Sequence, residues 1–175
     1  MKIIPFPETR QVYNYDCGAN CLLSVLCFAG IEEREDRIME RAGTKPGGDG
    51  TSFEGMTGVL QHFHVPFQVR TRVSPQQLRG YIDLGYPTII CLQAYRDFKR
   101  PYDTDWDDGH YVVAIGYDGD KIIFEDPSDF HRTWLTDSEL MERWHDRDQG
   151  RDVYGWGCTI TTQGEYQPNL MEHME

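Results

Sequence analysis

Apolar and polar residues follow a helical spacing through the first half of the chain. Asp16 stands at the N-cap position of one apolar segment, and Ser74 and Pro75 begin another. A loop rich in glycine and proline, residues 44–51, separates two of these segments, and residues 67–70 alternate as a short strand does. The predicted helices are 17–29, 32–42, 52–63 and 74–83.

From about residue 86 the pattern changes to short apolar runs that are separated by turns. The sequence Asp118-Gly119-Asp120 joins two of these runs and predicts a β-hairpin. Helices followed by antiparallel strands indicate an α+β fold. We expect a single domain over residues 1–164 and a frayed tail over 165–175. The predicted strands are 88–92, 111–117, 121–125, 134–135 and 156–162, and residues 137–145 are predicted as a helix.

The composition narrows the classes of partner. A chain of 175 residues is long enough to fold around its own core without disulfides or metal ions. The formal net charge of −12 disfavours binding to nucleic acid and to anionic membranes, and it favours binding of a basic substrate. The sequence has neither an apolar run that would span a membrane nor the core of a signal peptide. Five irregularly spaced cysteines are typical of reduced thiols, so we expect a cytoplasmic protein of undetermined oligomeric state.

Cys17 begins the first predicted helix and is the first candidate for chemistry. The unpaired N–H groups of a helix N-terminus favour the thiolate, which is the nucleophilic form of cysteine. The adjacent Gly18 would let another chain approach the sulfur closely. Cysteines are also commonly small, inert core residues, so position alone leaves both interpretations open.

His110 is the best-placed general base among the six histidines. It follows Gly109 and leads directly into the predicted strand 111–117, which would hold the imidazole rigidly. Asp126 ends the partner strand of the same hairpin, so both side chains lie at one end of it. A carboxylate there accepts the imidazole N–H and fixes its tautomer. The alternative is that His110 is a surface strand residue and Asp126 a turn residue.

Gln11 is a candidate for stabilising negative charge on a reacting oxygen. It lies six residues before Cys17. Its carboxamide N–H and the backbone N–H of Cys17 would together hold an oxyanion. The alternative is an exposed polar residue at the start of a loop.

Four motifs in order carry a family resemblance that covers roughly residues 5–162. They are Gln11-x5-Asp16-Cys17-Gly18-x2-Cys21-Leu22, Gly109-His110-Tyr111-Val112-Val113, Asp126-Pro127 and Leu140-x3-Trp144-His145-Asp146. With these motifs the sequence resembles the double-glycine, bacteriocin-processing cysteine peptidases of the papain-like clan. Transporter-linked members of that family also carry membrane and ATP-binding domains. This chain has no Gly-x4-Gly-Lys-Ser/Thr phosphate loop, so we expect a stand-alone member.

The resemblance implies a papain-like fold, in which an N-terminal helical half packs on a C-terminal antiparallel sheet with the active-site cleft between them. It implies that Cys17 is the nucleophile and that His110 is the general base and acid. It further implies that Asp126 orients His110 and that Gln11 donates to the oxyanion.

The acidic loop 103–108 precedes the candidate base. Its spacing is that of the start of a calcium loop, but Gly109 stands one place too late and no closing glutamate follows. We expect the loop to raise the pKa of His110 or to recruit basic substrate; whether it binds a cation stays open. We expect no metal site and no cofactor. Trp106 and Gly109 lie beside His110 and are expected, with Gly18, to contact substrate.

The predicted activity is hydrolysis of a peptide bond in a peptide or protein substrate through an acyl-enzyme on Cys17. Two alternatives stay open. The same residues would support acyl transfer to an amine, as in transpeptidation. The domain would also serve as a non-catalytic module that binds peptides in its cleft.

Overall fold

The computed structural model of the chain describes residues 1–46, 50–95, 100–169, 171 and 173. Within these residues, seven strands form one antiparallel sheet: β1 (Lys2–Ile3), β2 (Phe67–Arg70), β3 (Thr88–Gln93), β4 (Gly109–Asp118), β5 (Lys121–Glu125), β6 (Thr133–Thr136) and β9 (Gly157–Ile160). Their order is β2-β9-β3-β4-β5-β6, and β1 pairs with β4 just beyond the end of β3.

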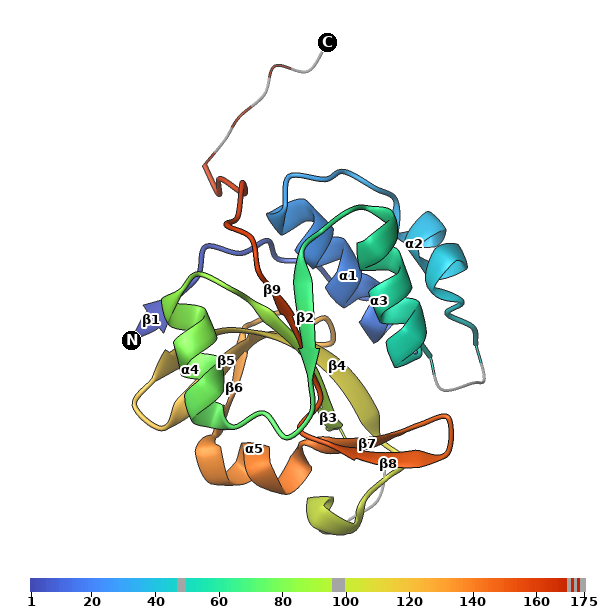
Figure 1. The fold of residues 1–175 in the computed structure, drawn as a ribbon, viewed down its shortest axis with the longest axis vertical. Helices are drawn as coiled ribbons and strands as arrows, with labels where there is room; N and C mark the ends of the chain where they lie inside the picture. Colours follow the sequence, from blue (N-terminus) through green and yellow to red (C-terminus); the bar gives the residue numbers. More distant parts are fainter. Residues whose placement is uncertain (47–49, 96–99, 170, 172, 174–175) are drawn as a thin grey trace.

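Helices cover both faces of this sheet (Figure 1). One face carries α1 (Cys17–Phe28), α2 (Glu35–Ala42) and α3 (Phe53–His62). The other face carries α4 (Pro75–Asp83) and α5 (Asp137–Arg143). The α+β fold and the helical half packed on an antiparallel sheet are therefore confirmed, and the second helical layer was not predicted.

The central strand β4 shows how two cores share one sheet. Tyr111, Val113 and Ile115 belong to the core beneath α1, α2 and α3, whereas Val112 and Ala114 belong to the core beneath α4 and α5. Successive side chains of a strand point to opposite faces, so a strand that is buried on both faces reads as a continuous apolar run. The apolar run that predicted this strand is a consequence of that double burial.

Side-chain caps determine where three of the helices begin. The Ser52 hydroxyl caps α3. Ser74 with Gln77, and Thr136 with Glu139, form capping boxes at α4 and α5. Each cap satisfies backbone N–H groups that have no partner within the helix. The predicted starts at residues 52 and 74 follow from these caps.

The largest error in the predicted elements concerns residues 145–154. The helix predicted over 137–145 ends at Arg143. The chain then forms a separate two-stranded hairpin of β7 (His145–Asp148) and β8 (Arg151–Tyr154). Its strands are short and charged, so they lack the alternation of apolar residues that would have indicated them.

The tryptophans divide between core and surface. As large aromatic residues in apolar segments, Trp134, Trp144 and Trp156 are all predicted to lie in the core. Trp144 and Trp156 are buried, but for Trp134 the prediction is wrong, because half of it is exposed. It lies on the edge strand β6, and the Lys121 ammonium sits 3.8 Å from its ring centroid.

The segment after Gly164 starts against the first helix. The backbone N–H groups of Glu165 and Tyr166 both donate to the Phe28 carbonyl, at 2.9 and 3.3 Å. The domain boundary at residue 164 stays a prediction. Among the described residues, no helix has the length and apolar character needed to cross a lipid bilayer.

The packing of Gly18 gives a first testable prediction. A Cβ at Gly18 would lie 2.7 Å from the Thr51 Cβ and 3.1 Å from the Tyr111 ring. Gly18→Ala should therefore lower the free energy of unfolding by roughly 1–3 kcal/mol through overpacking. Gly58 in α3 is the matched control, because a Cβ there meets nothing within 4 Å. Gly58→Ala should raise the free energy of unfolding by about 0.5–1 kcal/mol. Urea unfolding measures both, and equal effects would contradict the packing argument.

Candidate active site

A tightly closed loop leads into the N-terminus of α1. Asp16 occupies the N-cap position, but its buried carboxylate does not cap the helix. It accepts instead from the backbone N–H groups of Val12 and Tyr13, at 3.1–3.2 Å. Asp16 therefore fixes the loop that precedes Cys17, and with it the position of the Cys17 backbone.

The same loop is bound to the end of β5. The Gln11 backbone N–H donates to the Pro127 carbonyl at 3.0 Å. Arg10 forms an ion pair with the buried carboxylate of Glu125, which directly precedes Asp126. These contacts join the segment before Cys17 to the strand end that carries Asp126, the candidate orienting residue.

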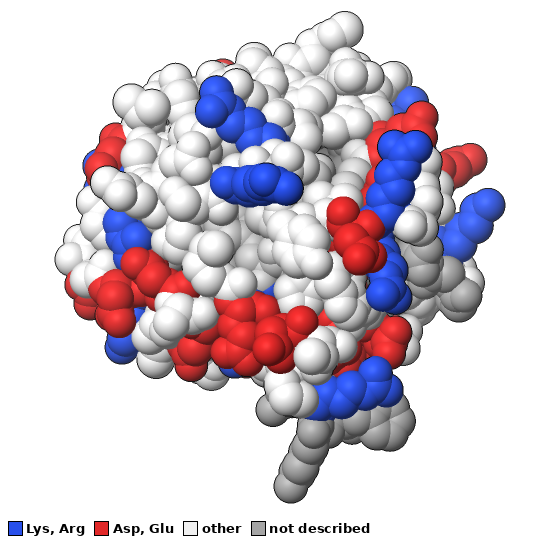
Figure 2. Space-filling view, turned by 60° about the horizontal axis from the view of Figure 1, so that its bottom comes forward, with Lys and Arg blue, Asp and Glu red and all other residues white. Residues whose placement is uncertain are grey.

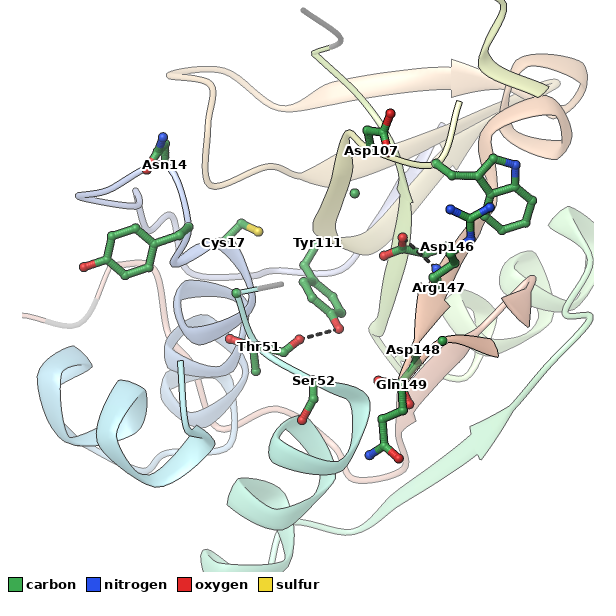
Figure 3. Close-up of a pocket in the computed structure, with 15 residues that line it drawn as sticks. Asn14, Cys17, Thr51, Ser52, Asp107, Tyr111, Asp146, Arg147, Asp148 and Gln149 are labelled. Atoms are coloured by element: carbon green, nitrogen blue, oxygen red, sulfur yellow. Dashed lines mark hydrogen bonds between the residues drawn. The ribbon is translucent and has the colours of Figure 1, made fainter. Parts of the chain in front are cut away.

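A cavity of about 570 Å³ opens where α1 meets the sheet (Figure 3). The thiol of Cys17 points into it. The cleft predicted between the helical half and the sheet is therefore present. Its lining residues are Asn14, Tyr15, Cys17, Gly50, Thr51, Ser52, Trp106, Asp107, Gly109, Tyr111, Asp146, Arg147, Asp148, Gln149 and Gly150.

His110 and Asp126 are paired at the end of the hairpin, as their sequence positions predicted. The imidazole Nε2 lies 2.9 Å from the Asp126 Oδ1, and both side chains are buried. An ionised carboxylate only accepts hydrogen bonds, so Nε2 carries the proton and the other ring nitrogen remains for Cys17. The structure thus brings Cys17, His110 and Asp126 into one chain of interactions.

Three further donors hold the Asp126 carboxylate. The Tyr95 hydroxyl donates at 2.6 Å, the Ser128 backbone N–H at 2.9 Å and the Thr133 hydroxyl at 3.1 Å. Burial opposes the charged form of Asp126, but the hydrogen bonds, led by that of His110, outweigh it and lower the pKa of this carboxyl. The carboxylate is therefore ionised beside the imidazole at neutral pH.

Tyr95 is the contact that the sequence analysis missed. Its ring packs edge-on against His110, with 5.4 Å between ring centroids, while its hydroxyl binds Asp126. Its backbone has φ of 55°, a left-handed conformation that is uncommon for a residue with a side chain. Nothing in the local sequence indicates this role, because Tyr95 lies 31 residues from Asp126.

The electrostatics of His110 follow from these neighbours. Burial lowers the pKa of the imidazole, but hydrogen bonds with Asp126 and Cys17 act in the opposite direction and raise the pKa to about 9. Asp126 and Cys17 are the groups that raise this pKa most, and the predicted influence of the acidic loop 103–108 stays a prediction. His110 therefore holds its proton at neutral pH and can deliver it to a leaving group.

Gln11 is anchored beside the site by both ends of its carboxamide. Its Nε2 donates to the Tyr13 carbonyl at 2.7 Å, and its Oε1 accepts from the Ser128 hydroxyl at 2.8 Å. A carboxamide has two N–H groups, so one donor remains beyond the bond to Tyr13. Gln11 does not line the cavity, and its role as an oxyanion donor stays a prediction.

The three predicted substrate contacts differ in their surroundings. Trp106 and Gly109 line the cavity. Gly18 does not, because Thr51 and Tyr111 fill the space beside it. The small size of Gly18 therefore has a packing reason, and substrate contact by all three residues stays a prediction.

The acidic loop 103–108 forms hydrogen bonds and an ion pair with neighbouring parts of the protein. Asp105 is buried, its Oδ1 accepts from the Asp107 N–H and its carbonyl lies 2.7 Å from the His145 Nε2. Asp107 pairs with Arg100 at 3.0 Å. Across the part of the chain that the structure describes, no three His, Cys, Asp or Glu side chains gather in a way that could hold a metal ion.

Comparisons with known proteins relate this geometry to a family. The model of the Peptidase C39 family matches residues 6–147. A C39-like peptidase from Bacillus anthracis has a similar structure, with a TM-score of 0.70 and 16% identity over 94% of this chain and 100% of that chain. No curated protein matches the sequence.

Two peptidase domains of transporters are also similar in structure. For the domain of Streptococcus ComA, a bifunctional ABC transporter in a quorum-sensing pathway, the TM-score is 0.60 with 22% identity over 88% of this chain and 97% of that chain. For a double-glycine motif protease of an AMS/PCAT transporter, solved with its leader peptide, the TM-score is 0.62 with 18% identity over 91% and 92%. At such identities the likeness shows the fold alone.

Titration of His110 tests the electrostatics of the site. We expect Asp126→Asn to lower the pKa of the imidazole from about 9, because the carboxylate that favours the charged ring is lost while burial remains. NMR of histidine-labelled protein measures the shift. Asp129→Asn is the matched control, since Asp129 is close in sequence but is not among the groups that raise this pKa most. A similar shift in both variants would contradict the specific role of Asp126.

Proposed function

Because the chain belongs to the Peptidase C39 family, we propose that it is a cysteine peptidase that cleaves a peptide or protein substrate through an acyl-enzyme on Cys17. The observation that carries the proposal is the chain of interactions from Cys17 through His110 to Asp126 at the edge of a cavity. Sulfur nucleophile, proton donor and orienting carboxylate are the three groups that such hydrolysis requires.

The proposed reaction begins with the attack of the Cys17 thiolate on the carbonyl carbon of the scissile bond. A carbon–sulfur bond forms and the carbonyl oxygen becomes an oxyanion. The backbone N–H of Cys17, at the N-terminus of α1, and the second carboxamide N–H of Gln11 are the proposed donors to that oxyanion. Asp16 supports this step by fixing the loop that carries both residues.

His110 serves in both halves of the reaction. The imidazolium gives its proton to the leaving amine as the carbon–nitrogen bond breaks, which leaves a thioester on Cys17. The neutral imidazole then takes a proton from water, whose oxygen attacks the thioester and releases the acid product. Asp126 keeps the ring oriented through both steps, and Tyr95, Ser128 and Thr133 keep Asp126 in place.

The leader peptide bound to the AMS/PCAT protease supports a peptide as the substrate class here. The acyl-enzyme would also react with an amine, which would make the protein a transpeptidase. A module that binds peptides without cleaving them is the other alternative. Product analysis with and without an added amine separates hydrolysis from acyl transfer, because the amine appears in the product only if it captures the acyl group.

Removal of the nucleophile tests the proposal directly. We expect the wild type to cleave members of a peptide library and Cys17→Ala to cleave none, while peptide binding is retained. Liquid chromatography with mass spectrometry measures cleavage, and fluorescence anisotropy measures binding. Binding without turnover by either protein would instead support the non-catalytic module.

Selective alkylation gives an independent control for the same site. With iodoacetamide at pH 6, Cys17 should react much faster than Cys91 or Cys158, which are buried. Burial raises the pKa of both buried thiols, to about 12 for Cys158. Equal rates at the three cysteines would contradict an activated nucleophile at Cys17.

Tyr95→Phe tests how Asp126 is held. Loss of a hydrogen bond to a charged group costs about 1.5–3 kcal/mol, so we expect kcat to fall roughly tenfold or more while KM changes little. Tyr117→Phe is the matched control. Tyr117 lies at the far end of β4 from His110, and its hydroxyl also donates to an aspartate, Asp83. If both variants lower kcat equally, Tyr95 has no special function at this site.

A further inference from the structure

Asp146 lies in the wall of the cavity, across from Cys17. It belongs to β7, and Figure 3 shows its carboxylate directed into the cavity between Tyr111 and Arg147. A Cβ at Gly109 would lie 2.7 Å from the Asp146 Oδ2. The missing side chain of Gly109 therefore makes room for this carboxylate directly beside the strand that carries His110.

The groups that hold the Asp146 carboxylate are all neutral. The Cys91 thiol donates to Oδ2 at 2.8 Å. The backbone N–H of Arg147 and the Gln93 amide donate to Oδ1, at 2.8 and 3.3 Å. These bonds fix the orientation of the carboxylate and leave its charge unbalanced, because no ion pair to Asp146 forms among the described residues.

The neighbouring basic side chains are engaged elsewhere. The Arg147 guanidinium pairs with Asp152 at 3.1 Å and lies 4.9 Å from the ring centroid of Trp106. The His145 Nε2 lies 2.7 Å from the Asp105 carbonyl. Burial raises the pKa of Asp146 although its hydrogen bonds and the charge of His145 act in the opposite direction, which reflects the free-energy cost of a partly desolvated carboxylate. A cation that entered the cavity would offset this cost.

The rest of the molecule favours a cation at the same place. Asp107 and Asp148 also line the cavity, whereas Arg147 is the one basic side chain that lines it among the described residues. Acidic side chains gather in a band across the lower half of the face in Figure 2, where basic ones are more scattered. With a net charge of −12, the protein attracts basic peptides over longer distances.

The place of the cavity in the proposed reaction decides which part of the substrate it holds. The leaving amine must reach His110, which does not line the cavity, whereas Cys17 does. The cavity therefore faces the acyl part of the substrate, which is the part on the N-terminal side of the scissile bond.

We propose that Asp146 is a specificity-determining residue that binds a lysine or arginine side chain of the substrate on the N-terminal side of the scissile bond. This inference rests on the proposed function. A charged hydrogen bond within a partly desolvated site contributes more than one at the surface, so the preference for a cation should be large enough to measure.

The test compares substrates that differ in one side chain. A positional-scanning library of acetyl-tetrapeptide aminocoumarin amides places lysine, arginine, norleucine and glutamate at each position before the leaving group. We expect the wild type to prefer lysine or arginine over norleucine by roughly tenfold or more in kcat/KM at one position, with glutamate disfavoured. Asp146→Asn should abolish this preference at that position.

Asp148→Asn is the matched control. It removes the same charge from the same cavity, but the Asp148 carboxylate accepts from the Phe53 N–H and belongs to the other end of β7. We expect it to keep most of the preference. Equal loss in both variants would overturn the assignment to Asp146 in favour of a diffuse electrostatic effect. Thermal unfolding and the alkylation rate of Cys17 show whether Asp146→Asn is folded.

Peptide binding separates this inference from the proposed function. Fluorescence anisotropy measures peptide binding to Cys17→Ala and to Cys17→Ala/Asp146→Asn. The labelled peptides contain lysine or norleucine at the position where the library shows the cation preference. If no library member is cleaved, each position is tested in turn. Tighter binding of lysine peptides to the first variant alone supports the inference even if no peptide is cleaved. Cleavage by the wild type without a cation preference overturns the inference and leaves the peptidase proposal intact. Equal binding of both peptides by both variants also overturns it.

Discussion

The hydrogen bond between His110 and Asp126 is the interaction on which the site depends. Two ionisable groups buried together cost free energy unless their remaining hydrogen-bonding capacity is satisfied. Here the imidazole keeps one nitrogen for Cys17, and the carboxylate accepts from three further donors. Those donors come from the segment after β3, the turn after β5 and the start of β6, so the pair forms only when the sheet is assembled.

The sheet places Cys17 and His110 by using both of its faces. Cys17 begins α1, which packs on the face formed by Tyr111, Val113 and Ile115. His110 stands at the start of the same strand, one position before Tyr111 and therefore on the opposite side of the pleat. Cys17 and His110 thus belong to different layers that meet at the start of β4. Burial on both faces leaves this strand little freedom to shift its register.

The loop before α1 links these layers a second time. The contacts of Arg10 with Glu125 and of Gln11 with Pro127 bind it to the end of β5. The Asp16 carboxylate then closes the loop by accepting from backbone N–H groups within it. A conventional N-cap would instead accept from the first turn of α1. Asp16 therefore occupies the N-cap position that its residue type predicts, but it does not cap the helix. Its carboxylate binds N–H groups of the preceding loop, which compete with those of the first helical turn.

The sequence by itself determined the features that depend on neighbours along the chain. The helix that begins at Cys17 and the hairpin that brings together His110 and Asp126 follow from spacing and turn chemistry, and the resemblance of the sequence motifs predicted the family of the chain. Only the tertiary structure decided which distant groups complete them. Tyr95 reaches Asp126 across 31 positions, and Asp146 reaches Cys91 across 55. Local patterns carry no information about such contacts, because the packing of the whole sheet and its two helical layers brings them together.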